Sequence, residues 1–161
     1  MNEPSVFKSE SLEEIEQRGM PMNNTHILKD GSLVQHRWVH NAYGALQQRA
    51  TWKGLHMRDR GQQRPFVLSR SFFFGSQRYG AMWTGDNSAT YDDVPLSMNM
   101  LLSLGVSGIV FGGSDLPGFN GVPDDDLYVQ FYQLGVYFPF FRAHAGKNNL
   151  MREPWLQSPR V

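Results

Sequence analysis

Residues 80–87 read Gly-Ala-Met-Trp-Thr-Gly-Asp-Asn, a short apolar run that passes directly into polar residues. A continuous apolar run of this length is typical of a strand buried on both faces of a sheet. The same order recurs where the run 65–68 is followed by Arg70, and where the run 108–111 is followed by Asp115. The repetition predicts several buried strands whose carboxyl ends carry polar side chains.

Helical spacing of apolar residues separates these runs. It predicts three helices, over 33–50, up to residue 104, and over 123–138. The second helix would be capped by Asp92 or Asp93. The apolar faces expected to be buried are Trp38, Ala42, Ala45 and Leu46 in the first helix, Met98, Leu101, Leu102 and Leu104 in the second, and Leu127, Phe131, Leu134 and Phe138 in the third. Strands that alternate with helices indicate an α/β fold with a parallel sheet. Polar strand ends favour a (β/α) barrel, and a doubly wound sheet is the alternative.

The composition restricts the function classes. The 161 residues include 15 Lys and Arg against 15 Asp and Glu, so no basic surface is expected for nucleic acid or an anionic membrane. The absence of cysteine excludes disulfides, a thiolate nucleophile and a Cys-ligated zinc. The apolar run 137–141 is too short to cross a bilayer, and no Gly-x-Gly-x-x-Gly loop supports nucleotide binding. Residues 8–32 are polar and are expected to form an irregular surface excursion.

The side chains near the predicted strand ends suit a sugar. They are Arg70, Trp83, Asp86, Asp115, Phe119 and His144. Charged and imidazole groups can hydrogen-bond ring hydroxyls, and an aromatic face packs on the apolar face of a pyranose. Other interpretations stay open: Asp86 and Asp115 could be turn or cap residues, Arg70 could pair with a carboxylate, and His144 could be structural.

Seven strings occur in the order of the motifs of glycoside hydrolase family 31. They are M-N-E-P at 1–4, H-N-A-Y-G at 40–44, R-P-F-V-L-S-R-S at 64–71, R-Y-G-A-M-W-T-G-D-N at 78–87, G-G-S-D-L-P-G-F at 112–119, F-F-R-A-H-A at 140–145 and R-E-P-W at 152–155. The chain therefore resembles this family from Met1 to about Trp155. The string G-S-Q-R at 75–78, together with R-E-P-W, resembles the neutral α-glucosidases, the group that includes the α-subunit of glucosidase II.

The resemblance implies the C-terminal half of a (β/α)8 TIM barrel. Residues 1–161 would form this partial catalytic barrel, from the end of strand four through strand eight. It also implies a retaining, exo-acting α-glucosidase that hydrolyses terminal α-linked glucose without a metal or cofactor. Asp86 would be the general acid/base. The substrate-binding residues would be Met1, Arg70, Trp83, Asp115, Phe119 and His144, with Asp115 as a supporting charge.

The nucleophilic Asp of the family stands directly before the Met of M-N-E, so here it would precede Met1. The isolated chain is therefore expected to be inactive, since a retaining glycosidase needs two carboxyl groups. The alternatives are a catalytically silent carbohydrate-binding chain and an unrelated α/β domain. Phe74 and Pro117 depart from the family pattern, so the sugar and linkage preference stay open.

The resemblance also implies partners and a compartment. The substrate would be an α-glucoside oligosaccharide or an N-glycan, and a glucosidase II-like protein would have a regulatory subunit. The expected compartment is the endoplasmic reticulum lumen or another secretory compartment. The glycosylation sequon Asn23-Asn24-Thr25 is consistent with that expectation.

Overall fold

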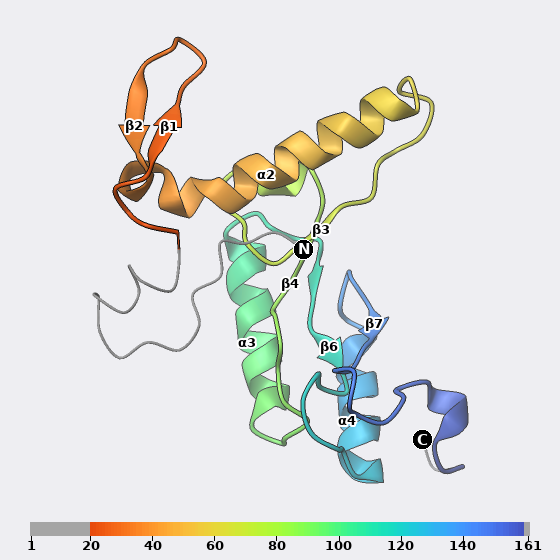
Figure 1. The fold of residues 1–161 in the computed structure, drawn as a ribbon. Coiled ribbons are helices and arrows are strands. Elements are labelled where there is room, and N and C mark those ends of the chain that lie inside the picture. The colour runs from red at the N-terminus through yellow and green to blue at the C-terminus, as the bar shows by residue number, and fades with distance from the viewer. Residues whose placement is uncertain (1–19, 160–161) are drawn as a thin grey trace. The chain divides into compact units, whose positions relative to one another are not determined.

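The structure is a computed structural model that describes residues 20–159, and Met1 lies outside this range. It divides into two compact units, Met1–Tyr79 and Gly80–Val161. Each unit is described separately below, with the element labels of Figure 1.

The first unit begins with a β-hairpin. Strand β1 (Thr25–Ile27) pairs antiparallel with β2 (Leu33–Gln35). Gly31 in the turn has a φ of 83°, which favours glycine, and the Leu28 N–H donates to the Ser32 carbonyl at 2.9 Å. Part of the stretch expected to be irregular is thus an ordered hairpin, because backbone hydrogen bonds can form there without a long apolar run.

Helix α2 (His36–Arg58) follows β2 directly and is longer than the predicted 33–50. Its predicted buried face is only partly correct, since Ala42 and Ala45 are half-buried but Trp38 is 76% exposed and Leu46 45%. The buried residues are His36, Gly44 and Gln48, spaced by multiples of four along one face. A Cβ at Gly44 would lie 2.3 Å from the Ser71 Cβ, so only glycine lets the helix approach that segment so closely.

A short segment after α2 completes the first unit. Strand β3 (Leu68–Ser69) is shorter than the run 65–68 predicted, and the 3₁₀ helix η1 (Ser76–Arg78) follows it. The buried Ser76 hydroxyl accepts a hydrogen bond from the Phe73 N–H at 3.1 Å. This bond holds the loop that follows β3 in a defined turn.

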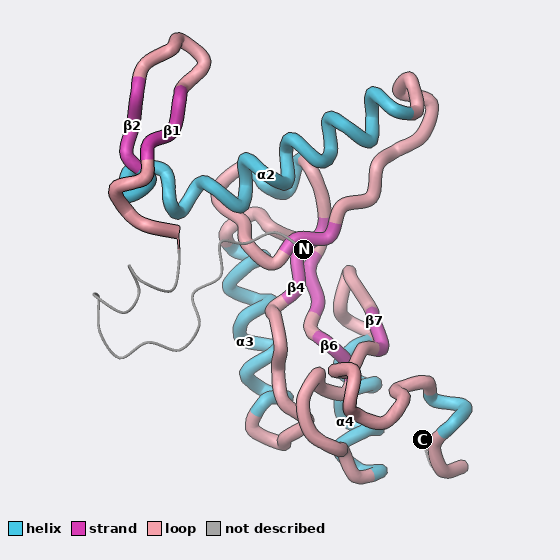
Figure 2. Tube along the Cα trace, in the orientation of Figure 1, coloured by secondary structure: helices cyan, strands magenta, loops and turns pink. Residues whose placement is uncertain are grey.

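The second unit is built on short parallel strands, drawn in magenta in Figure 2. Strand β4 (Ala81–Trp83) pairs with β5 (Gly112–Gly113), and β6 (Asp115–Leu116) pairs with β7 (Arg142–Ala143). The strand predicted at 108–111 is therefore displaced toward the C-terminus. The N–H groups of Gly108 and Ile109 instead donate to carbonyls of the preceding helix, at 3.0 and 2.9 Å, and close its last turn.

Helix α3 (Asp93–Val106) crosses from β4 to β5, and helix α4 (Asp125–Gly135) crosses from β6 to β7. Asp124 caps α4, since its carboxylate accepts from the Leu127 N–H at 2.8 Å. Asp92 stands at the N-cap position of α3, as predicted, but its side chain makes no capping hydrogen bond. The Thr90 hydroxyl accepts from the Asp93 N–H at 3.4 Å and donates to the Asp93 carboxylate at 2.6 Å.

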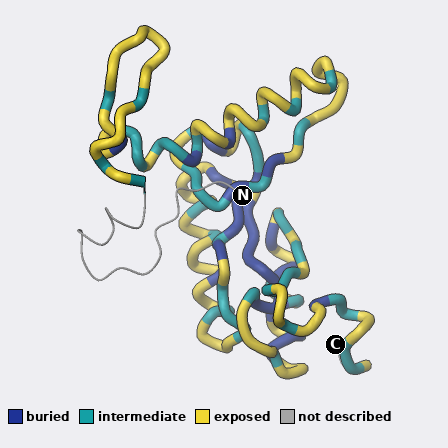
Figure 3. The backbone as a smooth tube through the Cα atoms, viewed as in Figure 1, coloured by how far each residue is buried: buried dark blue, intermediate teal, exposed yellow. Residues whose placement is uncertain are grey.

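Both helices of the second unit pack on one core. It consists of Leu116, Leu127, Phe131 and Phe138, with Val94 and Leu101 of α3 against them. Burial is continuous along residues 112–118, which include Leu116 of this core (Figure 3). The predicted buried positions of α4 are confirmed, apart from the half-buried Leu134. Parallel strands joined by crossover helices confirm the α/β prediction.

The predicted buried face of α3 is only partly correct. Leu101 and Leu104 are half-buried, but Met98 and Leu102 are 42% and 62% exposed. Both exposed residues line an apolar groove of about 500 Å³ whose other wall includes Leu134 and Tyr137. Within residues 20–159, no helix is long and apolar enough to cross a membrane.

Candidate active site

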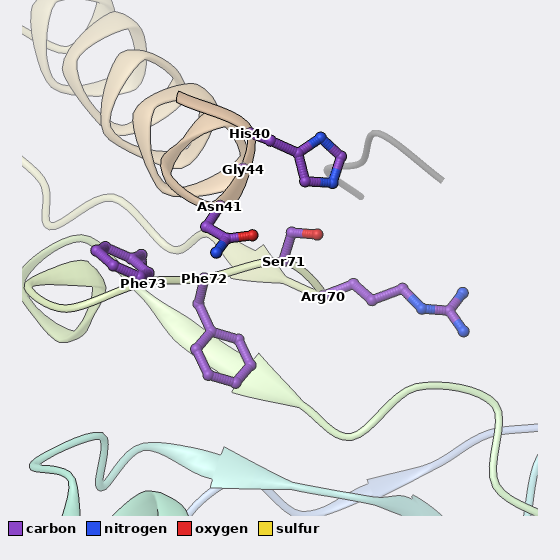
Figure 4. A pocket seen from close by; sticks show the side chains of 7 residues that line it. All are labelled: His40, Asn41, Gly44, Arg70, Ser71, Phe72 and Phe73. Atoms are coloured by element: carbon purple, nitrogen blue, oxygen red, sulfur yellow. The ribbon is translucent and has the colours of Figure 1, made fainter. Parts of the chain in front are cut away.

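Arg70 stands at the end of β3 in the first unit. It lines a pocket of about 400 Å³ together with His40, Asn41, Gly44, Ser71, Phe72 and Phe73. Figure 4 shows Arg70 extending from the strand end, while Asn41 of α2 is directed toward the segment that begins at Ser71. The pocket is polar where the helix meets this segment.

Asp86 follows β4 in the second unit. The strand is buried up to Trp83, and the Thr84 N–H donates to the Gly113 carbonyl at 3.1 Å. Gly85 then adopts a φ of 90°, which turns the chain out of the sheet, and Asp86 is exposed. The helix-cap interpretation of Asp86 is wrong, because α3 begins only at Asp93.

Asp115 is a fully buried strand residue rather than a turn residue. Its Oδ1 accepts a hydrogen bond from Arg142, with which it forms an ion pair across the β6–β7 register. Burial raises the pKa of Asp115, while the Arg142 guanidinium and then His144 act in the opposite direction. The carboxylate therefore depends on Arg142 for its charge compensation.

Arg142 is a site residue that sequence reasoning missed. Its guanidinium lies 5.4 Å from the centre of the Trp83 ring and 5.6 Å from that of Phe140. One cation thus joins the buried Asp115 to the aromatic wall. The signal was present, because Asp115 and Arg142 follow similar apolar runs at successive strand ends and carry opposite charges.

His144 and Phe119 form a second group at the same strand ends. Their ring centres are 5.4 Å apart. The His144 N–H donates to the Leu116 carbonyl at 3.1 Å, and Asn149 donates to the Phe119 carbonyl at 2.8 Å. His144 also lines a pocket of about 310 Å³ with Arg152. The backbone of each ring residue is therefore fixed by a hydrogen bond, that of His144 to Leu116 and that of Phe119 to the Asn149 side chain.

The second unit brings several of the sequence-predicted residues together. His144 lowers and Asp86 raises the pKa of Asp115, so each of these two groups lies within electrostatic range of Asp115. Trp83 joins them through Arg142. Arg70 belongs to the other unit, and Met1 lies outside the described residues. Across residues 20–159, no three or more His, Asp or Glu side chains are grouped so that they could hold a metal ion.

The whole chain, residues 1–161, matches the glycosyl hydrolases family 31 TIM-barrel domain. The chain belongs to this family. Its sheet is therefore part of a TIM barrel, and the alternatives of a doubly wound sheet and an unrelated α/β domain are excluded.

Curated relatives of this family 31 chain are α-glucosidases. It is 49% identical over 160 residues to a probable glucan 1,3-alpha-glucosidase of Arabidopsis thaliana, covering 99% of the chain and 16% of the relative. It is 49% identical over 156 residues to neutral alpha-glucosidase C of Homo sapiens, covering 97% and 16%. The chain thus spans about a sixth of the length of these relatives.

Solved structures of α-glucosidases are also similar to the chain. The family 31 chain matches the glucosidase II alpha subunit, in an alpha3-Glc2-bound crystal structure, with a TM-score of 0.81 and 46% identity over 89% of this chain and 15% of that chain. It matches a family 31 alpha-glucosidase from Bacteroides thetaiotaomicron with a TM-score of 0.68 and 41% identity, covering 76% and 21%.

Proposed function

We propose that this family 31 chain is the part of a retaining, exo-acting α-glucosidase that supplies its general acid/base, and that the whole enzyme removes terminal α-linked glucose from oligosaccharides or glycans. One observation supports the proposal most directly. Asp86 is an exposed carboxyl group on the loop after β4, within electrostatic range of the buried Asp115. Catalytic residues of TIM barrels stand at such strand ends.

Asp86 has two roles in the proposed reaction. It first gives its proton to the glycosidic oxygen, the bond from that oxygen to the anomeric carbon breaks, and a second carboxylate forms an ester with the sugar. Asp86 then takes a proton from water, which hydrolyses the ester. The motif resemblance puts the second carboxylate directly before Met1, about 5 to 5.5 Å from Asp86 in a folded retaining enzyme. Residues 1–161 alone would therefore be inactive.

The remaining side chains would bind the sugar at the cleaved bond. We assign Arg70 and His144 to its hydroxyls, Trp83 and Phe119 to its apolar faces, and Met1 to the neighbourhood of the nucleophile. Asp115 would act indirectly. Because it is fully buried and paired with Arg142, it supports the site by fixing that guanidinium against Trp83.

A partner and a compartment follow from the same proposal. One similar structure is a heterodimer of the glucosidase II catalytic subunit and the binding domain of its regulatory subunit. If the parent protein is of this kind, it would bind a regulatory subunit and act on N-glycans in the endoplasmic reticulum lumen. The alternative is a carbohydrate-binding protein without turnover.

The test is Asp86→Asn in the full-length protein. General acid help matters most when the departing oxygen is basic, and general acids contribute about 10²- to 10⁴-fold. We expect a loss of kcat/KM in this range for an α-linked glucose disaccharide and only a small loss for α-glucosyl fluoride. Steady-state kinetics on both substrates measures the difference.

Asp59→Asn is the matched control, because Asp59 undergoes the same chemical change at the end of α2, in the other compact unit. It should leave both rates unchanged. Equal losses on the two substrates with Asp86→Asn would remove Asp86 from the acid role. Binding of the disaccharide without any turnover by the wild-type protein would instead favour the carbohydrate-binding alternative.

A further inference from the structure

We propose that Asn87 is a positioning residue that clamps the loop carrying Asp86 to the neighbouring loop after β6. The proposal rests on the proposed acid role of Asp86. It assigns to Asn87 a task that is separate from contact with the sugar: the amide fixes where the carboxyl group of residue 86 stands relative to the sheet.

Asn87 joins the two loops through both its side chain and its backbone. Its Nδ2 donates to the Asp115 carbonyl at 3.0 Å, and its Oδ1 accepts from the Phe119 N–H at 3.3 Å. Its own carbonyl accepts from the N–H groups of Phe119 and Asn120, at 2.9 and 3.0 Å. One residue thus makes four contacts with residues 115–120.

Further contacts hold the loop on either side of Asn87. The Asn120 amide donates to the Asp86 carbonyl at 3.3 Å, and the Ala89 N–H donates to the Asn120 carbonyl at 2.8 Å. Gly118 lies so close that a Cβ there would be 2.4 Å from the Ala89 nitrogen, and its φ of 112° favours glycine. The two loops are therefore packed backbone to backbone.

The loop that carries Asp86 lies between β4 and α3, outside both elements. Gly85 precedes Asp86 with a positive φ, and α3 does not begin until Asp93. The Asp86 side chain is exposed, so packing alone does not orient it. General acid catalysis requires the carboxyl group within about 2.6–3.2 Å of the departing oxygen. A displacement of about 1 Å can lower a rate by about 100-fold.

The two hydrogen bonds of the Asn87 side chain reach two different parts of the site. Nδ2 reaches the backbone of Asp115, whose own side chain is paired with Arg142. Oδ1 reaches the backbone of Phe119, whose ring faces His144. Asn87 thereby ties the acid loop to the Asp115–Arg142 pair, which supports the site, and to Phe119 and His144, which we assign to the sugar. Loss of the amide should move the acid relative to both.

The experiment compares Asn87→Ala with Asp86→Asn in the full-length enzyme. Without the Asn87 amide, the acid should be misplaced while sugar binding persists. We expect kcat/KM for an α-linked glucose disaccharide to fall at least tenfold, a part of the about 10²- to 10⁴-fold effect of a general acid. The value for α-glucosyl fluoride should change less than threefold, because fluoride departs with little help. Asn99→Ala on the exposed surface of α3 is the matched control and should leave both values unchanged.

The outcomes separate the two proposals. If Asp86→Asn discriminates between the substrates but Asn87→Ala lowers both values equally or neither, the clamp is overturned and the acid role stands. If Asp86→Asn does not discriminate, the proposed function fails first. Asn120→Ala removes only the contact to the Asp86 carbonyl and serves if Asn87→Ala does not fold. Asn120→Ala should lower kcat/KM for the disaccharide by a smaller factor, and again more than for α-glucosyl fluoride. If it changes kcat/KM for the two substrates by the same factor, the clamp is overturned.

Discussion

Arg142 shows how one charge can serve two neighbours. Its partner Asp115 is completely buried, whereas Arg142 itself retains 25% of its side-chain exposure. The guanidinium therefore compensates the Asp115 carboxylate and also lies over the rings of Trp83 and Phe140. Removing the cation would leave a charge in a place where water cannot reach it, which is far more costly than losing an exposed ion pair.

We predict that Arg142→Met destabilises the full-length protein by about 3 kcal/mol, the low end for breaking a buried ion pair. Met keeps most of the side-chain volume, so the loss reports the charge. The double variant Arg142→Met with Asp115→Asn should recover part of the stability, because no charge then remains buried. Urea unfolding measures both, and equal stability of the single and double variants would contradict the explanation.

The pH dependence of this variant has a defined sign. Burial raises the pKa of Asp115, so the folded protein holds this proton more tightly than the unfolded chain does. Such a carboxyl group contributes stability that is fully present below the unfolded value of about 3.9 and is lost as the pH rises through the folded value. Without Arg142 the folded pKa rises further. The destabilisation by Arg142→Met should therefore be smaller at pH 5 than at pH 7.

At the scale of elements, the hairpin is joined to α2 by a row of imidazoles. The Nε2 of His26 lies 2.9 Å from the Nδ1 of His36, and the Nε2 of His36 lies 2.7 Å from the Nδ1 of His40. The Tyr43 ring packs edge-on against His36, at 5.7 Å between ring centres. Arg70 lines the same pocket as His40. His36 is fully buried between its two neighbours.

Each link in this row needs one N–H and one bare nitrogen. Three neutral rings carry three N–H groups, and the two links together with the two outer nitrogens have room for four. The row can therefore take up one extra proton, and a second would break a link. Burial, followed by the neighbouring His40 and His26, lowers the pKa of His36. The unfolded chain then binds the proton more readily, so the stability from His36 is present above pH of about 6.5 and is lost as the pH falls toward the folded value.

We therefore predict that acidification from pH 7.5 to 5.5 opens the hairpin. Hydrogen exchange of residues 24–40 in the full-length protein, corrected for the intrinsic rate, should increase at the lower pH. His26→Gln shortens the row and should weaken this response. His56→Gln is the control, since His56 stacks on Trp52 farther along α2. A response that is the same in all variants would contradict the prediction.

The sequence predicted the presence of the helices better than it predicted their buried faces and their first and last residues. Helix α4 was predicted well because its acidic cap and its apolar residues agree on one position. The buried face of α2 was not, because that face carries His36, Gly44 and Gln48, which hydropathy does not identify as core. At the start of α3 the N-cap position of Asp92 was predicted, but the hydrogen bonds between Thr90 and Asp93, three residues apart, were not.

At the scale of the whole molecule, the second unit exposes an apolar surface. Val106 and Tyr137 are almost fully exposed, and the apolar groove between α3 and α4 is open to solvent. In a TIM barrel each helix packs between two neighbours around a closed sheet. These side chains therefore suit contact with parts of the barrel that residues 1–161 do not contain, consistent with the share of the relatives that the chain spans.

We predict that residues 1–161 expressed alone form oligomers or aggregates, because exposed apolar patches and unpaired strand edges promote association. Size-exclusion chromatography and binding of an apolar dye should both report this, with the full-length protein as the control. A monomer with a single sharp unfolding transition would show that the chain buries enough surface by itself.

The candidate site was predicted in outline because motif strings mark the strand ends. Asp86 and His144 do follow strands β4 and β7, as the strings predicted, and their roles in the site stay predictions. Arg142 and Asn87 were missed because their importance comes from partners that are 27 and 28 residues away in the sequence, Asp115 in both cases. Hydropathy and local spacing contain no information on such pairs, which depend on the register of parallel strands.

The pairing of Asp115 with Arg142 also has a consequence for how the chain assembles. Strands β6 and β7 have two residues each, too few for backbone bonds alone to select one alignment. A slip by one residue would set Leu116 beside Arg142 and leave Asp115 buried without its cation. A misaligned form would therefore be destabilised by the uncompensated charge of Asp115. The ion pair thus favours the register in which Asp115 lies beside Arg142.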